Sequence, residues 1–232
     1  MKRAAALMSK GHLVSVVTAV SVVTAAALPV PVSAWPATGV PDTQLWTELD
    51  VTGPLYDKLT ITGVGQYRLS ESLANPTYTA GGVDVNYQEG SWDFSLGYRH
   101  QLTGHETYDP TVTQVARLTA THGWRIDRSR ILVRFRIDNT ITASSNPWRL
   151  RLRGEYRWAP EGWSLVDYLY VNDEVFYKLE NAEFFRNRFQ AGTNLKLTKR
   201  TDLKVYYQRQ DDLVSHPGAI NALGLQAEVT FE

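Results

Sequence analysis

The sequence predicts an all-β fold class, an antiparallel up-and-down transmembrane β-barrel of 10 to 12 strands. Three observations predict it: apolar and polar residues alternate along the chain, the alternating segments are long, and shorter connections alternate with longer ones. Alternation with a period of two is typical of strands with one apolar and one polar face. Many segments have 10 to 13 residues, which suits tilted strands that cross a bilayer in about 9–11 residues, whereas strands of soluble proteins usually have about 5–6.

The first 34 residues have the pattern of a secretory signal peptide. Basic residues begin this segment, an uncharged run of 16 residues follows at 13–28, and small residues end it at Val32 to Ala34. A membrane-spanning helix needs about 20 apolar residues, so this run is too short for a transmembrane anchor. We therefore expect cleavage after Ala34, with a removed signal peptide at 1–34 and a β-barrel domain at 35–232.

Five strands are expected in the N-terminal half of the barrel domain, at 44–51, 58–70, 79–87, 91–102 and 111–122. The second and third segments contain glycines at 63, 65, 81 and 82, which in strands are typical of bends or bulges. The fourth segment alternates clearly. Its apolar parity consists of Trp92, Phe94, Leu96 and Tyr98, and its other parity of Asp93, Ser95, Gly97 and Arg99.

Six further strands are expected in the C-terminal half, and one of them has the strongest alternation in the chain. In the segment 148–158, one parity holds tryptophan, leucine, glycine and tyrosine, while the other holds arginine and glutamate. This pattern predicts a strand with one apolar and one ionic face. The six segments are 130–141, 148–158, 164–177, 187–198, 203–211 and 220–231.

These segments number eleven, whereas single-chain bacterial barrels have an even number of strands with both termini in the periplasm. We therefore expect either 10 or 12 strands. Three explanations stay open: the stretch Trp35–Thr43 contains a further crossing or a plug segment, one segment is misassigned, or the strand at 44–51 is not a full member of the barrel.

The connections and the aromatic residues agree with a membrane barrel. Short periplasmic turns are expected at 52–57, 88–90, 123–129, 159–162 and 199–202, and mostly longer external loops at 70–78, 101–110, 142–147, 178–186 and 212–219. Tryptophan and tyrosine favour the headgroup level because their rings are apolar with one polar group. The expected aromatic girdle beside the short turns consists of Tyr56, Tyr87, Trp92, Trp124, Trp158 and Trp163.

If the apolar parity faces lipid, the other parity gives the barrel an ionic lumen. Side chains nearly fill a barrel of this size, and buried charges have to be paired or solvated, so we expect an interlocking ionic network. A second interpretation is a basic ladder, Arg149, Arg151 and Arg153 with Arg134 and Arg136, that binds anionic solutes through paired guanidinium donors. The expected lumen network consists of Glu48, Arg68, Arg99, Arg117, Arg134, Arg136, Arg149, Arg151, Arg153, Glu155, Arg157, Glu174 and Arg188.

The composition excludes several functional classes. The chain has no cysteine, which excludes a disulfide framework and a cysteine-ligated metal or redox site. Its 24 basic and 24 acidic residues give no electrostatic footprint for nucleic acid. Outside the signal peptide, His100, His105, His122 and His216 have no partner at a spacing that predicts a catalytic set, and His105 with Glu106 is too small a group for a metal site. We expect no catalytic residue, metal or cofactor.

Several short motifs together resemble a known family. The motifs are Trp46–Thr47–Glu48, Gln66–Tyr67–Arg68, Leu150–Arg151–Leu152–Arg153, Asp173–Glu174–Val175–Phe176, Asn187–Arg188 and Tyr207–Gln208. In this order and spacing, over essentially the whole chain after the signal peptide, they resemble the exported proteins grouped as domain of unknown function 2490. The resemblance implies an outer-membrane-type barrel in Gram-negative bacteria without an established activity. One departure is the C-terminus, where Glu232 follows the aromatic Phe231 on which such barrels tend to end.

These observations predict a protein of the Gram-negative outer membrane with a structural or narrow-pore transport role. Its expected partners are outer-membrane lipids, the barrel-assembly machinery during insertion, and small anionic solutes as candidate cargo. Two alternatives stay open. One is a soluble periplasmic barrel of lipocalin type, in which the apolar parity faces inward around a ligand. The other is an outer-membrane enzyme, a hydrolase or acyltransferase, that modifies lipids.

Overall fold

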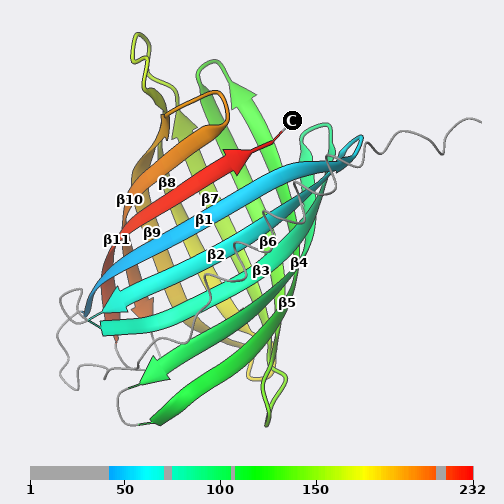
Figure 1. Cartoon of the computed structure of the whole chain (residues 1–232), viewed down its shortest axis with the longest axis vertical. Coiled ribbons are helices and arrows are strands. Elements are labelled where there is room, and N and C mark those ends of the chain that lie inside the picture. Colours follow the sequence, from blue (N-terminus) through cyan, green and yellow to red (C-terminus); the bar gives the residue numbers. More distant parts are fainter. Residues whose placement is uncertain (1–41, 71–74, 106–107, 213–217, 232) are drawn as a thin grey trace, which may run out of the picture.

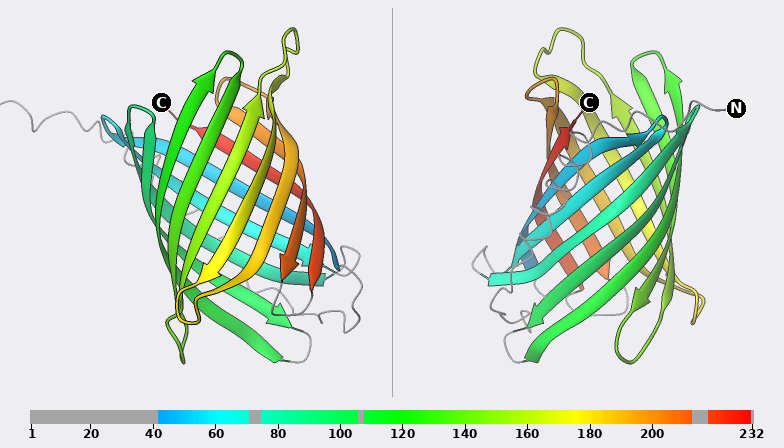
Figure 2. Two further views of the ribbon diagram at one scale, coloured as in Figure 1. Left: turned by 180° about the vertical axis from the view of Figure 1, so that it is seen from behind. Right: turned by 45° about the vertical axis from the view of Figure 1, so that its right-hand side comes forward.

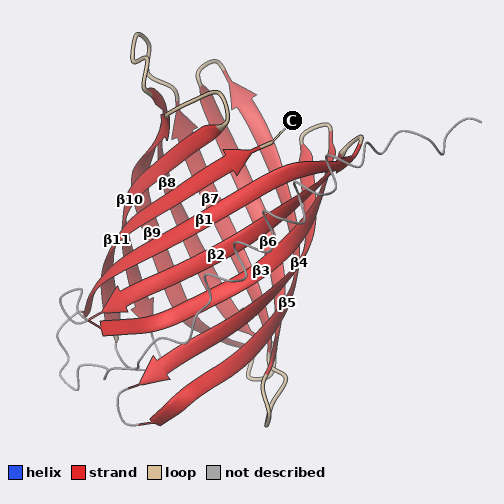
Figure 3. Cartoon of the chain, in the orientation of Figure 1, coloured by secondary structure: helices blue, strands red, loops and turns tan. Residues whose placement is uncertain are grey.

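The computed structural model describes residues 42–231, with gaps at 71–74, 106–107 and 213–217. The expected signal peptide at 1–34 and the stretch 35–41 lie outside the described residues. Every regular element in the described part of the chain is a strand (Figure 3). None of the described residues forms a helix long and apolar enough to cross a membrane.

The described residues form eleven strands, and each lies where alternation predicts one (Figure 1). The strand with the strongest alternation has the predicted bounds, while most of the others extend a few residues further. The strands are β1 (Asp42–Tyr56), β2 (Leu59–Ser70), β3 (Asn75–Glu89), β4 (Trp92–His105), β5 (Tyr108–Ile126), β6 (Ser129–Ile141), β7 (Trp148–Trp158), β8 (Val166–Lys178), β9 (Glu183–Lys196), β10 (Thr201–Asp212) and β11 (Ala219–Thr230).

The strands close into one barrel, inclined to its axis, in which neighbours in sequence are neighbours in space (Figure 2). All pairs of consecutive strands are antiparallel, but β1 and β11 pair in parallel, from Asp42 opposite Ile220 to Thr52 opposite Thr230. The predicted barrel and the predicted range of 10 to 12 strands are confirmed. The expectation of an even number and of antiparallel pairing throughout is wrong.

The parallel pair follows from the odd strand number. When eleven strands alternate in direction, the first and the last run the same way, so only a parallel ladder can close the sheet. Closure leaves no unpaired edge, which a sheet in lipid would not tolerate. Because β1 pairs with both β2 and β11, it is a full member of the barrel, and no segment is misassigned.

Several connections differ from their expected lengths, and two of them depart from the expected contrast between short turns and long loops. The stretch 101–110 was expected as a long loop, but β4 continues to His105 and β5 begins at Tyr108. Conversely, the short turn expected at 159–162 lengthens because β8 begins only at Val166. The contrast in connection length between the two ends of the barrel is therefore weaker than the sequence predicts.

Three connections at one end of the barrel, the turn end, are two-residue turns. The first turn residue has a left-handed backbone in each: Asp57 with φ 38°, Gly90 with φ 60° and Asp127 with φ 49°. Glycine and aspartate adopt this conformation more readily than most residues, and it matches the twist of the flanking strands. These turns fix the register of three hairpins.

The apolar parity faces outward. Leu96, Phe135 and Leu223, on three different strands, expose 65%, 58% and 53% of their surface. A ligand-binding barrel of lipocalin type needs these rows to face inward, so the orientation on which that alternative depends is wrong.

The interior is polar instead. Gln208, Asn194 and Glu174 are almost completely buried inside the barrel, and among the described residues the buried apolar cluster consists of Trp46, Ile220 and Ala222. The barrel is therefore held by its ladders and by polar contacts in the lumen, without a large hydrophobic core.

Tyr206 helps to close the barrel near the parallel pair. It lies opposite Gly224 of β11 and Gly192 of β9. A β-carbon on Gly224 would lie 2.0 Å from the ring carbon Cζ of Tyr206, so the ring packs directly on the backbone of β11. This contact requires glycine at position 224.

Candidate functional site

The lumen contains a polar cavity of about 540 Å³. Its lining follows β3 from Tyr78 to Asn86, a distance of about 26 Å at the usual rise per strand residue. Eleven cationic and six anionic side chains line it, an excess of five positive charges. They are Arg68, Arg99, Arg117, Arg134, Arg136, Arg149, Arg151, Arg153, Arg186, Arg188 and Lys204, and Glu48, Asp50, Asp84, Asp138, Glu174 and Glu228.

Glu174 is the centre of the largest ionic group. It points inward from β8, where it lies opposite Arg153 of β7 and Arg188 of β9. Its Oε1 accepts a hydrogen bond from Arg134 Nη2 at 2.6 Å, and its Oε2 accepts one from Arg151 Nη2 at 2.7 Å. Arg188 Nη1 lies 3.8 Å away. One buried carboxylate therefore holds arginines from three strands.

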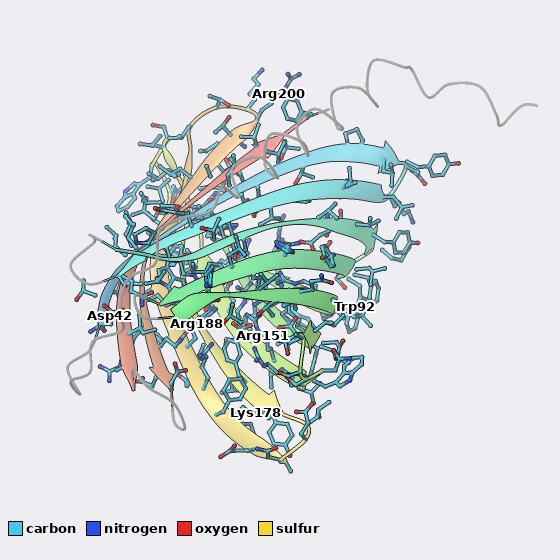
Figure 4. All side chains as sticks on the ribbon, turned by 60° about the horizontal axis from the view of Figure 1, so that its bottom comes forward. Asp42, Trp92, Arg151, Lys178, Arg188 and Arg200 are labelled. Carbon is cyan, nitrogen blue, oxygen red and sulfur yellow. The ribbon has the colours of Figure 1, made fainter. Side chains whose placement is uncertain are left out.

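Arg151 connects this group to Asp138 of β6, since its Nη1 lies 3.2 Å from Asp138 Oδ2. Its guanidinium also lies 4.5 Å from the ring centroid of Phe176. Figure 4 shows Arg151 and Arg188 inside the ring of strands and Trp92 at its periphery. Charge-assisted contacts of this kind stiffen a lumen because each side chain has several partners.

A second ionic group lies nearer the turn end. Glu155 of β7 accepts from Arg157 Nε at 2.5 Å and contacts Arg153 Nη2 at 3.1 Å. Asn172 Nδ2 donates to the same carboxylate at 3.3 Å. Alternation along β7 places all three charged residues on the inner face.

A third ionic group links β3 to β4. Arg99 donates from Nη1 and Nη2 to the two carboxylate oxygens of Asp84, at 2.9 and 2.5 Å. The arginine side chain is only 4% exposed. Sequence analysis predicted Arg99 but missed Asp84, because the glycines before it weaken the alternation of that segment.

Arg68 and Glu48, both predicted for the network, do not pair with each other in an ion pair. Arg68 lies between two aromatic rings, 3.7 Å from the centroid of Trp46 and 4.1 Å from that of Tyr78. Glu48 accepts instead from the amide of Gln66. Stacked arginine is favourable because its planar cation is weakly hydrated.

Inward side chains near the parallel pair form what we call the seam wall: Glu48, Asp50, Lys204, Gln226 and Glu228. Gln226 Nε2 donates to Asp50 at 2.7 Å and to Glu228 at 3.1 Å, and Lys204 forms an ion pair with Glu228. Lys204 and Glu228 are absent from the predicted network, although both lie on the polar parity of their segments.

On the other side of the lumen, the inward arginines of β5, β6 and β7 form what we call the arginine wall. Three of its members, Arg117, Arg136 and Arg149, have no carboxylate within ion-pair distance among the described residues. The predicted network therefore divides into connected groups and unpaired cations. The arginine wall consists of Arg117, Arg134, Arg136, Arg149, Arg151 and Arg153.

The residues predicted for the aromatic girdle are all exposed and lie near the turn end. Trp92 stacks on Phe94 at 5.8 Å between ring centroids, and its ring lies 4.5 Å from that of His122. The other members lie at the ends of their strands or in the connection between β7 and β8. The six are Tyr56, Tyr87, Trp92, Trp124, Trp158 and Trp163.

Hydrogen-bonded carboxylates lie at both rims of the barrel. At the turn end, Lys58 Nζ lies 2.6 Å from Glu89 Oε2, and this hydrogen bond lowers the pKa of Glu89. At the other end, the backbone N–H of Trp148 donates to the carboxylate of Glu180 and lowers its pKa. Both carboxylates therefore stay charged at neutral pH.

Among the described histidines, His122 lies beside a serine at the turn end of the barrel. His122 Nδ1 lies 3.2 Å from Ser91 Oγ, and the ring packs between Trp92 and Trp124. No acidic side chain completes this pair in the described part of the chain, which also holds no group of three potential metal ligands. The loop residues Glu106 and His216 lie outside it.

The chain matches one family model and is similar to several solved structures. A family model described as "Protein of unknown function (DUF2490)" matches residues 43–219. Among solved structures, the chain is similar to an anion-selective porin from Comamonas acidovorans, with a TM-score of 0.41, 12% identity and coverage of 76% of this chain and 54% of that chain. It is also similar to the siderophore receptor PirA from Pseudomonas aeruginosa, with a TM-score of 0.29, 18% identity and coverage of 78% and 35%. The chain thus spans about half of the porin and about a third of the receptor. No curated protein matches it.

Proposed function

The chain belongs to the DUF2490 family, and from its own geometry we propose that it is a bacterial outer-membrane β-barrel with a narrow, solute-permeable lumen. Since the family description states no activity, the support comes from the outer face and from the cavity.

The outer face supports a lipid environment. Leucine, valine, isoleucine and phenylalanine side chains are exposed on strands around the barrel, and soluble monomers rarely expose apolar surface of that extent. The exposed tryptophans and tyrosines at the turn end suit the headgroup level. The signal peptide expected at 1–34 supports export, and among Gram-negative compartments the outer membrane is the one that holds such barrels.

The observation that carries the permeable lumen is the cavity. Its volume of about 540 Å³ lies in the range of about 300–1,000 Å³ typical of ligand sites, and polar side chains line it along most of the barrel. A completely interlocked interior would leave no such space.

A planar bilayer tests permeability. Purified, refolded protein should give discrete small conductance steps in potassium chloride. A barrel that inserts, migrates in detergent gels with the heat-dependent shift of a closed barrel, and stays electrically silent would contradict a permeable lumen and favour a structural role for the ionic network.

Cell fractionation tests location. We expect the protein in the outer-membrane fraction, soluble only in detergent, with a mature N-terminus at Trp35. Release by osmotic shock without detergent would contradict a membrane protein, and an uncleaved N-terminus would contradict the signal peptide.

A lipid-modifying enzyme remains a second candidate, favoured by the contact of Ser91 with His122 at the turn end. Replacing His122 with alanine should leave the lipid composition of the cell unchanged if the barrel is not an enzyme. A change in lipid acylation in that variant would favour the enzyme instead.

A further inference from the structure

We propose that the arginine wall binds a small oxyanion, a phosphate or carboxylate group, at a site formed by Arg117, Arg136 and Arg149. The proposal deepens the function proposed above, because it names the solute class for which the lumen is built.

The strand register brings the three arginines together. Arg117 of β5 lies directly opposite Asp138 of β6, and Asp138 lies directly opposite Arg149 of β7. Arg136 precedes Asp138 by two residues on the same face of β6, and lies opposite Arg151. Residues at such diagonal positions have α-carbons about 7–8 Å apart, which long side chains easily bridge. All three arginines line the cavity.

The carboxylates nearby are already shared by other cations. Glu174 accepts from Arg134 and Arg151, and Asp138 pairs with Arg151 at 3.2 Å. Two carboxylates therefore stand among five arginines in this part of the lumen, so the wall keeps an excess of positive charge. The five are Arg117, Arg134, Arg136, Arg149 and Arg151.

The guanidinium groups of the three site arginines have free donors. The side chain of Arg136 makes one hydrogen bond among the described residues, from Nε to Thr119 Oγ1 at 3.0 Å, which leaves both terminal amino groups available. The Nε atoms of Arg117 and Arg149 are buried without a partner. Arg149 also lies 5.7 Å from the ring centroid of Phe185, which shields one side of it from water.

An oxyanion satisfies these groups better than any other small ligand. Unpaired charges in an enclosed interior are costly, and an anion between three guanidinium groups relieves that cost. Planar guanidinium groups donate pairs of parallel hydrogen bonds to phosphate or carboxylate oxygens. A spherical halide cannot accept such pairs, so the site should prefer oxyanions to chloride.

Calorimetric titration of the full refolded chain in neutral detergent tests the site. Inorganic phosphate at constant ionic strength should bind saturably, whereas sodium chloride should not. Glycerol 3-phosphate and succinate serve as separate arms that distinguish a phosphate ester from a dicarboxylate as the natural solute. The absence of saturable binding in all three oxyanion arms would overturn the proposal.

Substitutions test which residues bind. Arg136→Ala should weaken phosphate binding at least about tenfold, the factor for the loss of one good contact, and Arg136→Lys should also weaken it because lysine lacks the planar fork. The matched control is Arg128→Ala, since Arg128 lies in the β5–β6 turn, is 53% exposed and pairs with Glu161. Unchanged binding in Arg136→Ala, or an equal loss in Arg128→Ala, would contradict the site.

Asp138→Asn gives an independent test of the site if the arginine variants fail to fold. It removes the carboxylate that competes with the ligand, so phosphate should bind more tightly, and weaker binding would overturn the site. Binding in detergent does not depend on conduction. Phosphate binding by an electrically silent barrel would contradict only the permeable lumen, whereas conduction without oxyanion binding would contradict only this site.

Discussion

The arginine wall and the seam wall face each other across the lumen, since β1 lies five strands from both β6 and β7 around the barrel. The seam wall holds three carboxylates and one cation, Lys204, which pairs with Glu228, while an uncharged amide, Gln226, donates to Asp50 and Glu228. In the arginine wall cations outnumber carboxylates. The two walls show that inward carboxylates can be satisfied by amides as well as by cations, and that only the wall rich in arginine leaves cations without a carboxylate among the described residues.

The two walls should differ most in how far the removal of one carboxylate lowers the free energy of unfolding. Glu174→Gln leaves Arg134, Arg151 and Arg188 without their shared carboxylate, and breaking a buried ion pair in this way costs about 3–5 kcal/mol. The measurement is urea unfolding of the refolded barrel in detergent, followed by tryptophan fluorescence.

The matched change in the seam wall is Glu228→Gln. The side chain of Glu228 is 34% exposed, against 3% for Glu174, so its loss should cost clearly less. Equal losses of unfolding free energy in the two variants would remove the distinction between the walls.

A second pair of variants should show that the walls differ only on the inside. Leu152 of β7 and Leu49 of β1 both face outward. An arginine on the lipid face near mid-depth costs about 2–4 kcal/mol, so Leu152→Arg and Leu49→Arg should destabilise the barrel to a similar degree. If either arginine is tolerated without loss in the unfolding midpoint, the outer face of that wall does not contact lipid.

The sequence predicts which side chains face the lumen better than it predicts which charges pair. Alternation is unbroken along β7 and clear from Val133 to Asp138 of β6, so the inward position of their arginines follows from the period alone. The pairing of charges does not, because Arg68 stacks on Trp46 and Tyr78 instead of meeting Glu48. Such choices depend on the register of neighbouring strands, which places Arg68 directly opposite Trp46 and Tyr78.

The parallel pairing of β1 with β11 also cannot be predicted from the sequence. A strand shows the same alternation of apolar and polar residues whether its neighbour is parallel or antiparallel. Only the odd count of eleven segments indicated that the closure had to differ from a regular barrel, and it allowed several explanations. The contact of Tyr206 with Gly224 likewise needs the register, since nothing in either segment alone predicts it.

A third change affects only the packing beside the parallel pair of β1 and β11. Gly224→Ala places a methyl group within 2.0–2.5 Å of ring carbons of Tyr206, and overpacking of this kind typically costs about 1–3 kcal/mol. Tyr206→Ala in the same chain should recover part of the loss, because it removes the clash. Additive losses in the double variant would show that the ring does not pack on β11.

The smallest effect is expected at the rim, outside both walls. Lys58→Ala should raise the pKa of Glu89 toward its ordinary value, because the hydrogen bond from Lys58 that lowers it is lost. A lowered carboxyl pKa stabilises the fold above the unfolded-state pKa, and that contribution disappears as pH falls through the folded-state pKa. At this exposed pair we expect a shift in an NMR titration of Glu89 without a measurable change in unfolding. An unchanged pKa would contradict the contact.

The orientation of the two parities can be measured directly by spin labelling, since the chain has no native cysteine. Single cysteines along β7, at 149–157 in turn, would carry nitroxide labels in protein reconstituted into lipid bilayers. Accessibility to oxygen should peak at Leu150 and Leu152, and accessibility to a water-soluble nickel complex at Arg149, Arg151 and Arg153, with a period of two and opposite phase. Oxygen-accessible arginine positions, or accessibility without alternation, would contradict a lipid-facing apolar row around an arginine-rich lumen.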